Sequence, residues 1–249
     1  MTKNVFITGG TSGIGKSLIY KFAEHGFNIF FTYYNNLNEA RSISKNLERY
    51  NILSNYVKMD LSKPITINNA FKKFSRQFKK LNIFINNASI KTQRKEFLKL
   101  KNIEISKNIN ELLIGNIISL RKALELILKK NSSNQSLIIN ISSYASISGG
   151  INIHLYASSK SALNTLTTAL SKDSFKKKIK FFSIVPRYID TPSFRRNNNI
   201  KNNRDLNLFK KRKKIKRIKN SKEFANFVYN KFIRNINAKY KPIIHYDSF

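Results

Sequence analysis

The stretch TGGTSGIG, residues 8–15, decides the fold, because it joins the apolar run Val5-Phe6-Ile7 to a stretch with helical spacing. Gly9 and Gly13 can adopt backbone angles closed to other residues, and Gly15 lets a helix pack close to a strand. The free N–H groups at the start of such a helix point at a negatively charged group. A turn that only joins strand to helix can carry the same spacing, but a second apolar run, residues 28–32, follows where a βαβ unit needs it. We therefore predict a phosphate cradle for a dinucleotide.

Short apolar runs rich in Ile, Val and Phe alternate with longer stretches of helical spacing along the whole chain. The runs predict strands at 5–8, 28–32, 54–59, 83–86, 137–141, 180–185 and 243–246. The other stretches predict helices at 14–24, 37–50, 65–79, 103–130, 156–174 and 222–235. Strands without clean polar alternation, separated by helices, are typical of a parallel sheet covered on both faces. We predict an α/β fold, a Rossmann-like doubly wound parallel sheet of about seven strands, in a single domain over residues 1–249.

Composition narrows the class of protein. The chain has 249 residues and no cysteine, so it is long enough for one domain with a large core and does not rely on disulfides. No apolar stretch approaches the ~20 residues that a membrane helix needs, and we expect a cytoplasmic protein with no membrane partner. No His, Cys or carboxylate cluster has the spacing of metal ligands, so we predict no metal.

The formal net charge of +34 favours phosphates, acidic proteins and nucleic acid as partners at low salt. Lys, Asn and Ile are all abundant, so the charge can also come from a compositional bias that would act on any fold. The charge is densest at residues 193–222, where thirteen Arg or Lys stand against one acid, Asp205. We expect a mobile basic insertion there, forming a lid on the substrate side; a solvated charge run is the alternative.

Polar and small residues follow the predicted strands, at the sheet edge where open parallel sheets bind ligands. They include Asp60-Leu61, the stretch NNAS at 86–89, Ser142-Ser143 and the stretch PRYIDT at 186–191. Beyond them, Tyr156 and Lys160 have the i, i+4 spacing that places both on one helix face. A cation beside a phenol favours the phenolate, so we predict that Lys160, together with a cationic nicotinamide, lowers the pKa of Tyr156.

Together these motifs resemble the short-chain dehydrogenase/reductase family across nearly the full chain. The family's TGxxxGxG loop matches residues 8–15, and its NNAG appears as NNAS at 86–89. Its catalytic residues match Asn116, Ser143, Tyr156 and Lys160. The resemblance implies an NAD(P)-dependent oxidoreductase that transfers hydride between nicotinamide and a carbonyl or alcohol. It implies that Tyr156 protonates the carbonyl oxygen, Ser143 holds that oxygen, Lys160 binds the nicotinamide ribose and tunes Tyr156, and Asn116 holds a relay water.

The resemblance also implies a set of cofactor-binding residues, in which Asp60 contacts the adenine. The set is Gly9, Thr11, Ser12, Gly13, Ile14, Gly15, Tyr33, Tyr34, Asp60, Leu61, Asn87, Ala88, Tyr156, Lys160, Pro186, Ile189 and Thr191. Members that prefer NAD usually end the second strand with an acid, where this chain has Tyr33 and Tyr34. NADPH is therefore favoured over NADH, although the arginine that often holds its 2′-phosphate is missing, and Arg41 or Lys16 would have to replace it.

Within the family, the chain most resembles the 3-oxoacyl-(acyl-carrier-protein) reductases of fatty acid synthesis, on residues 185–192, 221–225 and 244–247. That resemblance implies a homotetramer. It also implies an acidic acyl carrier protein docked at Lys176, Lys177 and Lys178, near the mouth of the active site. Ser89 and Arg187 stand where the family has glycine. Two alternatives remain: a reductase or dehydrogenase of another carbonyl or alcohol, such as a sugar, steroid or small ketone, and a nucleic-acid-binding protein on a reductase fold.

Overall fold

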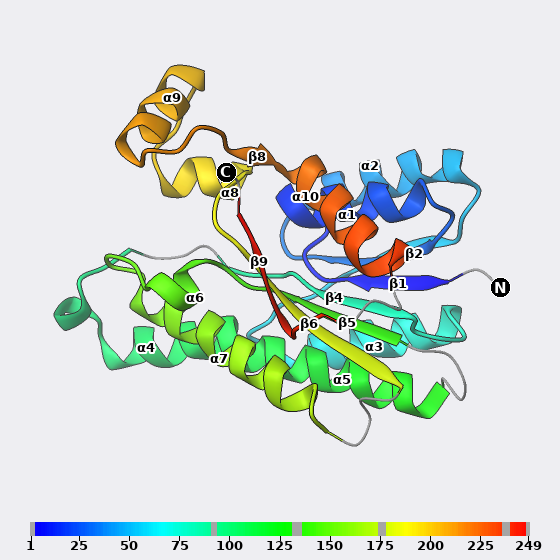
Figure 1. Cartoon of the computed structure of the whole chain (residues 1–249). Coiled ribbons are helices and arrows are strands. Elements are labelled where there is room, and N and C mark those ends of the chain that lie inside the picture. Colours follow the sequence, from blue (N-terminus) through cyan, green and yellow to red (C-terminus); the bar gives the residue numbers. More distant parts are fainter. Residues whose placement is uncertain (1–2, 91–93, 131–135, 174–177, 236–239, 248–249) are drawn as a thin grey trace.

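A seven-stranded, fully parallel sheet forms the centre of the molecule, with strands in the order β3-β2-β1-β4-β5-β6-β9 (Figure 1). The computed structural model describes residues 3–90, 94–130, 136–173, 178–235 and 240–247. The strands are β1 Asn4–Ile7, β2 Asn28–Tyr33, β3 Ser54–Lys58, β4 Ile83–Asn86, β5 Ser136–Ile141, β6 Ile179–Pro186 and β9 Ile243–Tyr246. The predicted doubly wound α/β fold is confirmed, and each predicted strand is present.

Helices cover both faces of this sheet. One face carries α1 Gly13–Ala23, α2 Leu37–Leu47 and α10 Ser221–Val228. The other carries α3 Pro64–Gln77, α5 Gly115–Lys130 and α7 His154–Leu170. Shorter elements are η1 Glu48–Tyr50, η2 Phe97–Lys99, α4 Asn102–Ile109 and α6 Ala145–Ser148, together with the π-helical turns η3 Asn110–Ile114 and η5 Tyr229–Arg234. The long helix predicted over 103–130 is thus α4, a π-turn and α5 in succession.

Burial on both faces explains why the strands read as continuous apolar runs. Successive residues point to opposite faces, so Val5 and Ile7 pack with α1, whereas Phe6 packs on the α3 side. The Phe6 ring lies 4.8 Å from that of Phe30 and 5.5 Å from that of Phe74, centroid to centroid. This packing holds the strands in register and therefore sets where their carboxyl ends present polar residues.

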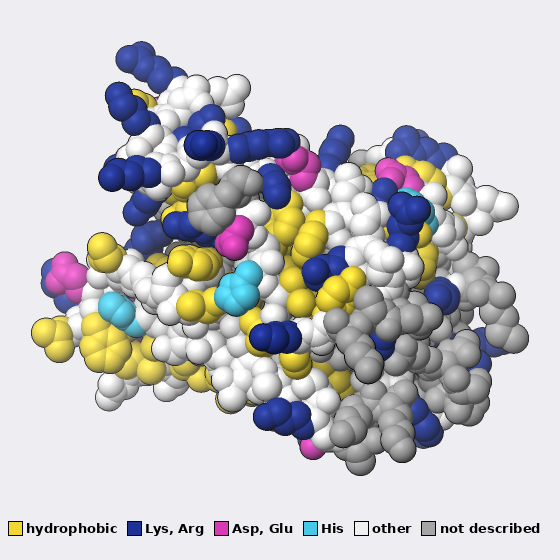
Figure 2. All heavy atoms as spheres, viewed as in Figure 1, with side chains coloured by type: hydrophobic (Ala, Val, Ile, Leu, Met, Phe, Trp, Pro, Cys, Tyr) yellow, Lys and Arg dark blue, Asp and Glu magenta, His cyan; other side chains and the backbone are white. Residues whose placement is uncertain are grey.

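The basic segment is folded into short helices with an apolar core of its own, and the expected mobility of this insertion stays a prediction. It contains α8 Pro192–Asn197 and α9 Asn203–Arg212, flanked by the paired short strands β7 Ile189–Asp190 and β8 Lys219–Asn220. Ile200, Phe209 and Ile215 form its own small apolar core. We call residues 192–220 the basic arm; it projects from the sheet above β9 in Figure 1, and Figure 2 shows Lys and Arg side chains gathered on it. Across the described part of the chain, no helix is long and apolar enough to cross a membrane.

Candidate active site

The glycine turn between β1 and α1 makes an anion cradle. Gly9 and Gly13 have φ values of +69° and +53°, which side-chain-bearing residues rarely adopt. Ser12 precedes the helix without a side-chain capping bond, and the first turn of α1 contains no acid. The amides at the start of α1 are therefore suited to an anion. A Cβ at Gly15 would lie 2.2 Å from the Gly9 carbonyl oxygen, so only glycine allows this close approach.

Hydrogen bonds connect the cradle to the neighbouring strands. Thr8 Oγ1 accepts from the backbone amides of Asn87 and Ala88, each at 2.9 Å. The Asn87 side-chain amide donates to the carbonyl oxygens of Thr8 at 2.9 Å and Gly9 at 3.1 Å. Thr32 Oγ1 accepts from Gly9 N at 3.1 Å. The carboxyl ends of β1, β2 and β4 are therefore held as one unit around the turn.

A cleft of about 1450 Å³ runs along this edge of the sheet. It is lined by most of the residues that the sequence predicted: Gly9, Thr11, Ser12, Gly13, Ile14, Tyr33, Tyr34, Asp60, Leu61, Asn87, Ala88, Ser143, Tyr156, Lys160, Pro186, Ile189 and Thr191. Gly15 and Asn116 do not line it. Several cations that the sequence did not single out also line it: Arg94 and Lys107, and, from within the predicted basic lid, Arg196, Arg212 and Lys213. No spacing motif marks them, because they reach the cleft from loops and helices outside the sheet.

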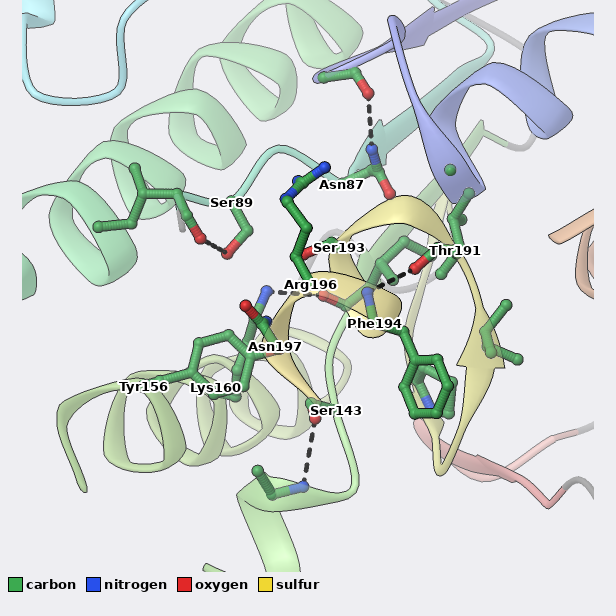
Figure 3. Close-up of a pocket in the computed structure, with 18 of the residues that line it drawn as sticks. Asn87, Ser89, Ser143, Tyr156, Lys160, Thr191, Ser193, Phe194, Arg196 and Asn197 are labelled. Carbon is green, nitrogen blue, oxygen red and sulfur yellow. Dashed lines mark hydrogen bonds between the residues drawn. The ribbon is translucent and has the colours of Figure 1, made fainter. Parts of the chain in front are cut away.

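Tyr156, Lys160 and Ser143 meet at one end of the cleft (Figure 3). Tyr156 and Lys160 lie one turn apart on α7, and Ser143 follows β5. The Ser143 hydroxyl lies close enough to the Tyr156 phenol to lower its pKa. Lys160 Nζ donates to the Ile141 carbonyl at 2.9 Å and lies 5.9 Å from the centre of the Tyr156 ring. The three groups can therefore act on the same substrate oxygen.

Burial controls the titration of this cluster. It raises the pKa of the Tyr156 phenol, and the neighbouring Ser143 hydroxyl offsets only part of that rise. Burial also lowers the pKa of the Lys160 ammonium to about 8. The predicted lowering of the Tyr156 pKa included a bound cationic nicotinamide and stays a prediction. In the protein alone, desolvation disfavours the phenolate more than the neighbouring residues favour it.

Asn116 lies behind the cleft wall, at the point where the π-turn becomes α5. Its side-chain amide donates to the Leu112 carbonyl at 2.9 Å, and its backbone carbonyl accepts from Asn86 Nδ2 at 3.1 Å. Asn86 Nδ2 also donates to Asn140 Oδ1 at 3.0 Å. Asn116 is thus connected through a buried amide network to the ends of β4 and β5. Within the described residues, no group of three His, Cys, Asp or Glu side chains could hold a metal ion.

This arrangement of residues is found together with the sequence pattern of a known protein family. The model of the family described as short chain dehydrogenase matches residues 3–202. The chain belongs to this family. It is an oxidoreductase of the short chain dehydrogenase family.

Curated relatives of this short chain dehydrogenase include the uncharacterized oxidoreductase YhxC of Bacillus subtilis, 27% identical over 190 residues. That match covers 76% of this chain and 65% of YhxC, slightly less than two thirds of its length. The NADP-dependent 3-hydroxy acid dehydrogenase of Schizosaccharomyces pombe is 26% identical over 190 residues, covering 76% and 72% of the two chains. The 3-oxoacyl-(acyl-carrier-protein) reductase FabG of Aquifex aeolicus is 25% identical over 186 residues, covering 74% and 73%.

Solved structures share the fold over almost the whole chain. A Burkholderia cenocepacia short chain dehydrogenase in complex with NADP has a TM-score of 0.83 at 21% identity, covering 98% of this chain and 96% of that one. Levodione reductase has a TM-score of 0.86 at 20% identity, with the same coverage.

This short chain dehydrogenase accommodates both departures from the family's glycines. Ser89 is exposed at the cleft, and its hydroxyl lies 3.5 Å from the Ile90 carbonyl oxygen. Arg187 stacks its guanidinium over the ring of Tyr144, 5.1 Å from the centroid, and its backbone amide donates to the Tyr246 carbonyl at 3.1 Å.

The placement of Lys178 at the mouth of the active site is wrong. Lys178 directly precedes β6, and its carbonyl accepts from Ser136 N at the start of β5. It therefore lies at the amino edge of the sheet, whereas the cleft lies at the carboxyl edge. Lys176 and Lys177, named with it as a docking site, lie outside the described residues.

Proposed function

We propose that this chain is an NADPH-dependent reductase of 3-oxoacyl thioesters bound to acyl carrier protein, acting in fatty acid synthesis. The meeting of Tyr156, Ser143 and Lys160 at one end of a cleft that begins at the glycine turn carries the proposal. The similarity to FabG supports the substrate class, and the resemblance at residues 185–192 and 221–225 adds to it.

The residues of the cleft fit a dinucleotide. The uncapped start of α1 and the glycine turn suit the pyrophosphate, and Asp60 suits the adenine. No carboxylate lies among Tyr33, Tyr34, Asn35 and Asn36, so the end of β2 does not repel a 2′-phosphate. The NADP named with the Burkholderia structure and the S. pombe relative supports NADPH, whereas a Brucella melitensis 3-ketoacyl-(acyl-carrier-protein) reductase of similar fold was solved with NADH.

Each catalytic side chain has a distinct proposed role. When bound, the nicotinamide supplies the hydride. Ser143 donates a hydrogen bond that holds the substrate's carbonyl oxygen, and Tyr156 donates its phenolic proton to that oxygen. Lys160 binds the nicotinamide ribose and stabilises the phenolate that remains. The high pKa of Tyr156 keeps its proton in place at neutral pH. Asn116, in the buried amide network with Asn86 behind the cleft wall, is the proposed holder of a relay water that restores this proton.

An assay of NADPH oxidation with acetoacetyl thioesters tests this function. We expect turnover by the wild type, and Tyr156→Phe should lower kcat by about 10² to 10⁴, because proton donation is lost while the ring remains. Tyr144→Phe, which also lines the cleft, is the matched control and should retain activity. An active Tyr156→Phe variant would overturn the proposed chemistry.

The same assay separates the alternatives. Turnover of a sugar, steroid or small ketone without turnover of thioesters would favour another reductase. Tight RNA binding at physiological salt, without any NADPH oxidation, would favour a nucleic-acid-binding protein. A homotetramer and a cytoplasmic location remain predictions, which sedimentation and fractionation can measure.

A further inference from the structure

Two adjacent arginines on α8 have different surroundings. Arg195 is paired with Asp190 through two bonds, Nε to Oδ1 at 2.7 Å and Nη2 to Oδ2 at 2.8 Å. Arg196 instead lines the cleft, and Figure 3 shows its side chain extending from α8 toward the side where Asn87 and Ser89 lie. The pairing of Arg195 holds this end of α8 against β7, which leaves the next arginine directed at the cleft.

Arg196 brings an exposed guanidinium without an ion-pair partner among the described residues to the cleft. Within the described residues, its guanidinium has no carboxylate or hydrogen-bond acceptor. Asp60, an acid that lines the same cleft, is hydrogen-bonded to the backbone amide and hydroxyl of Ser62 instead. A guanidinium offers five donors in a planar fork that matches phosphate oxygens. Its chemistry therefore suits a phosphate ligand.

The start of α8 packs directly against the anion cradle, which brings Arg196 near it. Thr191 caps α8 by accepting from Phe194 N at 3.1 Å, and its Cβ and Cγ2 lie 3.3 Å from where a Cβ on Gly13 would be. Arg196 follows Thr191 by five residues, which is about 7 Å along a helix. A long arginine side chain can span that distance back toward the cradle.

We propose that Arg196 binds the pyrophosphate of the bound dinucleotide and so holds the basic arm over the cofactor. This inference rests on the proposed NADPH-dependent function, and it assigns the basic arm a part in cofactor binding. The same guanidinium chemistry also suits the 2′-phosphate of NADPH or a phosphate on a thioester substrate. Those two sources are the competing outcomes of the test.

Equilibrium binding of NADPH and NADH, measured by calorimetry, tests the proposal without turnover. Arg196→Gln should raise the Kd for both dinucleotides by a similar factor of about tenfold or more, because both contain the pyrophosphate. Arg196→Lys should restore part of the affinity. Arg204→Gln, an exposed change on α9 outside the cleft, is the matched control and should change either Kd less than about twofold.

Three results would overturn the proposal. An unchanged Kd for both dinucleotides excludes a contact between Arg196 and the bound cofactor. A loss confined to NADPH assigns Arg196 to the 2′-phosphate. Unchanged dinucleotide affinity with a raised KM for acetoacetyl-coenzyme A, but not for an uncharged acetoacetyl thioester, assigns it to a substrate phosphate. A wild type that binds neither dinucleotide would instead overturn the proposed function itself.

Limited trypsin digestion provides a second readout. The basic arm offers many cleavage sites, among them Lys201, Arg204 and Lys210. If Arg196 holds the arm over the cofactor, saturating NADPH should slow cleavage of the arm in the wild type. Protection should be lost in Arg196→Gln at NADPH concentrations that saturate the variant. Equal protection of both proteins would show that the arm is not held through Arg196.

Discussion

At the scale of single residues, burial destabilises the charged form of Lys160. Its ammonium is buried, it donates to the Ile141 carbonyl, and its pKa is lowered to about 8 from 10.5. Between these two pH values the unfolded chain binds more protons at this lysine than the folded chain does. The contribution of Lys160 to the free energy of unfolding therefore rises with pH across this window.

This linkage makes the stability of the wild type depend measurably on pH. From about pH 7.5 to about 9.5, the free energy of unfolding of the wild type should rise by about 2 kcal/mol relative to Lys160→Met, which has no titrating group at this position. Urea unfolding at each pH measures the difference. Parallel pH profiles for the two proteins would contradict a lowered pKa for Lys160.

At the scale of elements, the junction of the π-turn η3 with α5 positions Asn116. Gly115 begins α5, and a Cβ there would lie 2.2 Å from the Leu61 carbonyl oxygen and 2.9 Å from its carbonyl carbon. These are backbone atoms, which cannot rotate away as a side chain does. The close contact of α5 with the loop after β3 therefore requires glycine at this position.

Gly115→Ala should consequently lower the free energy of unfolding by about 1–3 kcal/mol, because α5 must shift away from Leu61. Gly150→Ala is the matched control: its Cβ would meet only the Ile153 side chain, which can change rotamer, so its effect should be within about 0.5 kcal/mol. Denaturant unfolding of both variants checks this. Equal stabilities would show that the junction tolerates a methyl group.

At the scale of the whole molecule, the net charge is +34, and Lys and Arg are densest on the basic arm, which borders the cleft. Arg212 and Lys213 line the cleft from the arm, whereas Lys178 lies at the opposite edge of the sheet. If an acidic carrier protein delivers the substrate, its docking should therefore depend on the arm rather than on Lys178. Exposed charges of this kind act mainly on association, and salt screens them.

We expect kcat/KM for a carrier-bound 3-oxoacyl substrate to fall roughly tenfold or more as salt rises from about 0.05 to 0.5 M. With a short uncharged thioester it should change little. Replacing both Arg212 and Lys213 by Glu should reproduce the loss for the carrier-bound substrate, and Lys178→Glu should not. Equal salt dependence for the two substrates would contradict docking through charge.

Much of the fold and part of the candidate site could be predicted from the sequence because they depend on local order. The glycine turn at 8–15 requires particular backbone angles, the strands are continuous apolar runs, and Tyr156 and Lys160 are neighbours through helix geometry alone. Each of these features is encoded within a few adjacent residues. The chain by itself therefore determined the parallel α/β sheet and the pairing of phenol with ammonium.

Only the tertiary structure decided the features that depend on distant segments. The raised pKa of Tyr156 follows from burial by the surrounding elements, and desolvation leaves no mark in spacing. Folding of the basic arm depends on Phe209 meeting Ile200 and Ile215, and the direction of Arg196 on the pairing of Arg195 with Asp190. Lys178 is separated from the cleft by the length of β6. Packing sets these distances and environments, so they exist only once the chain has folded.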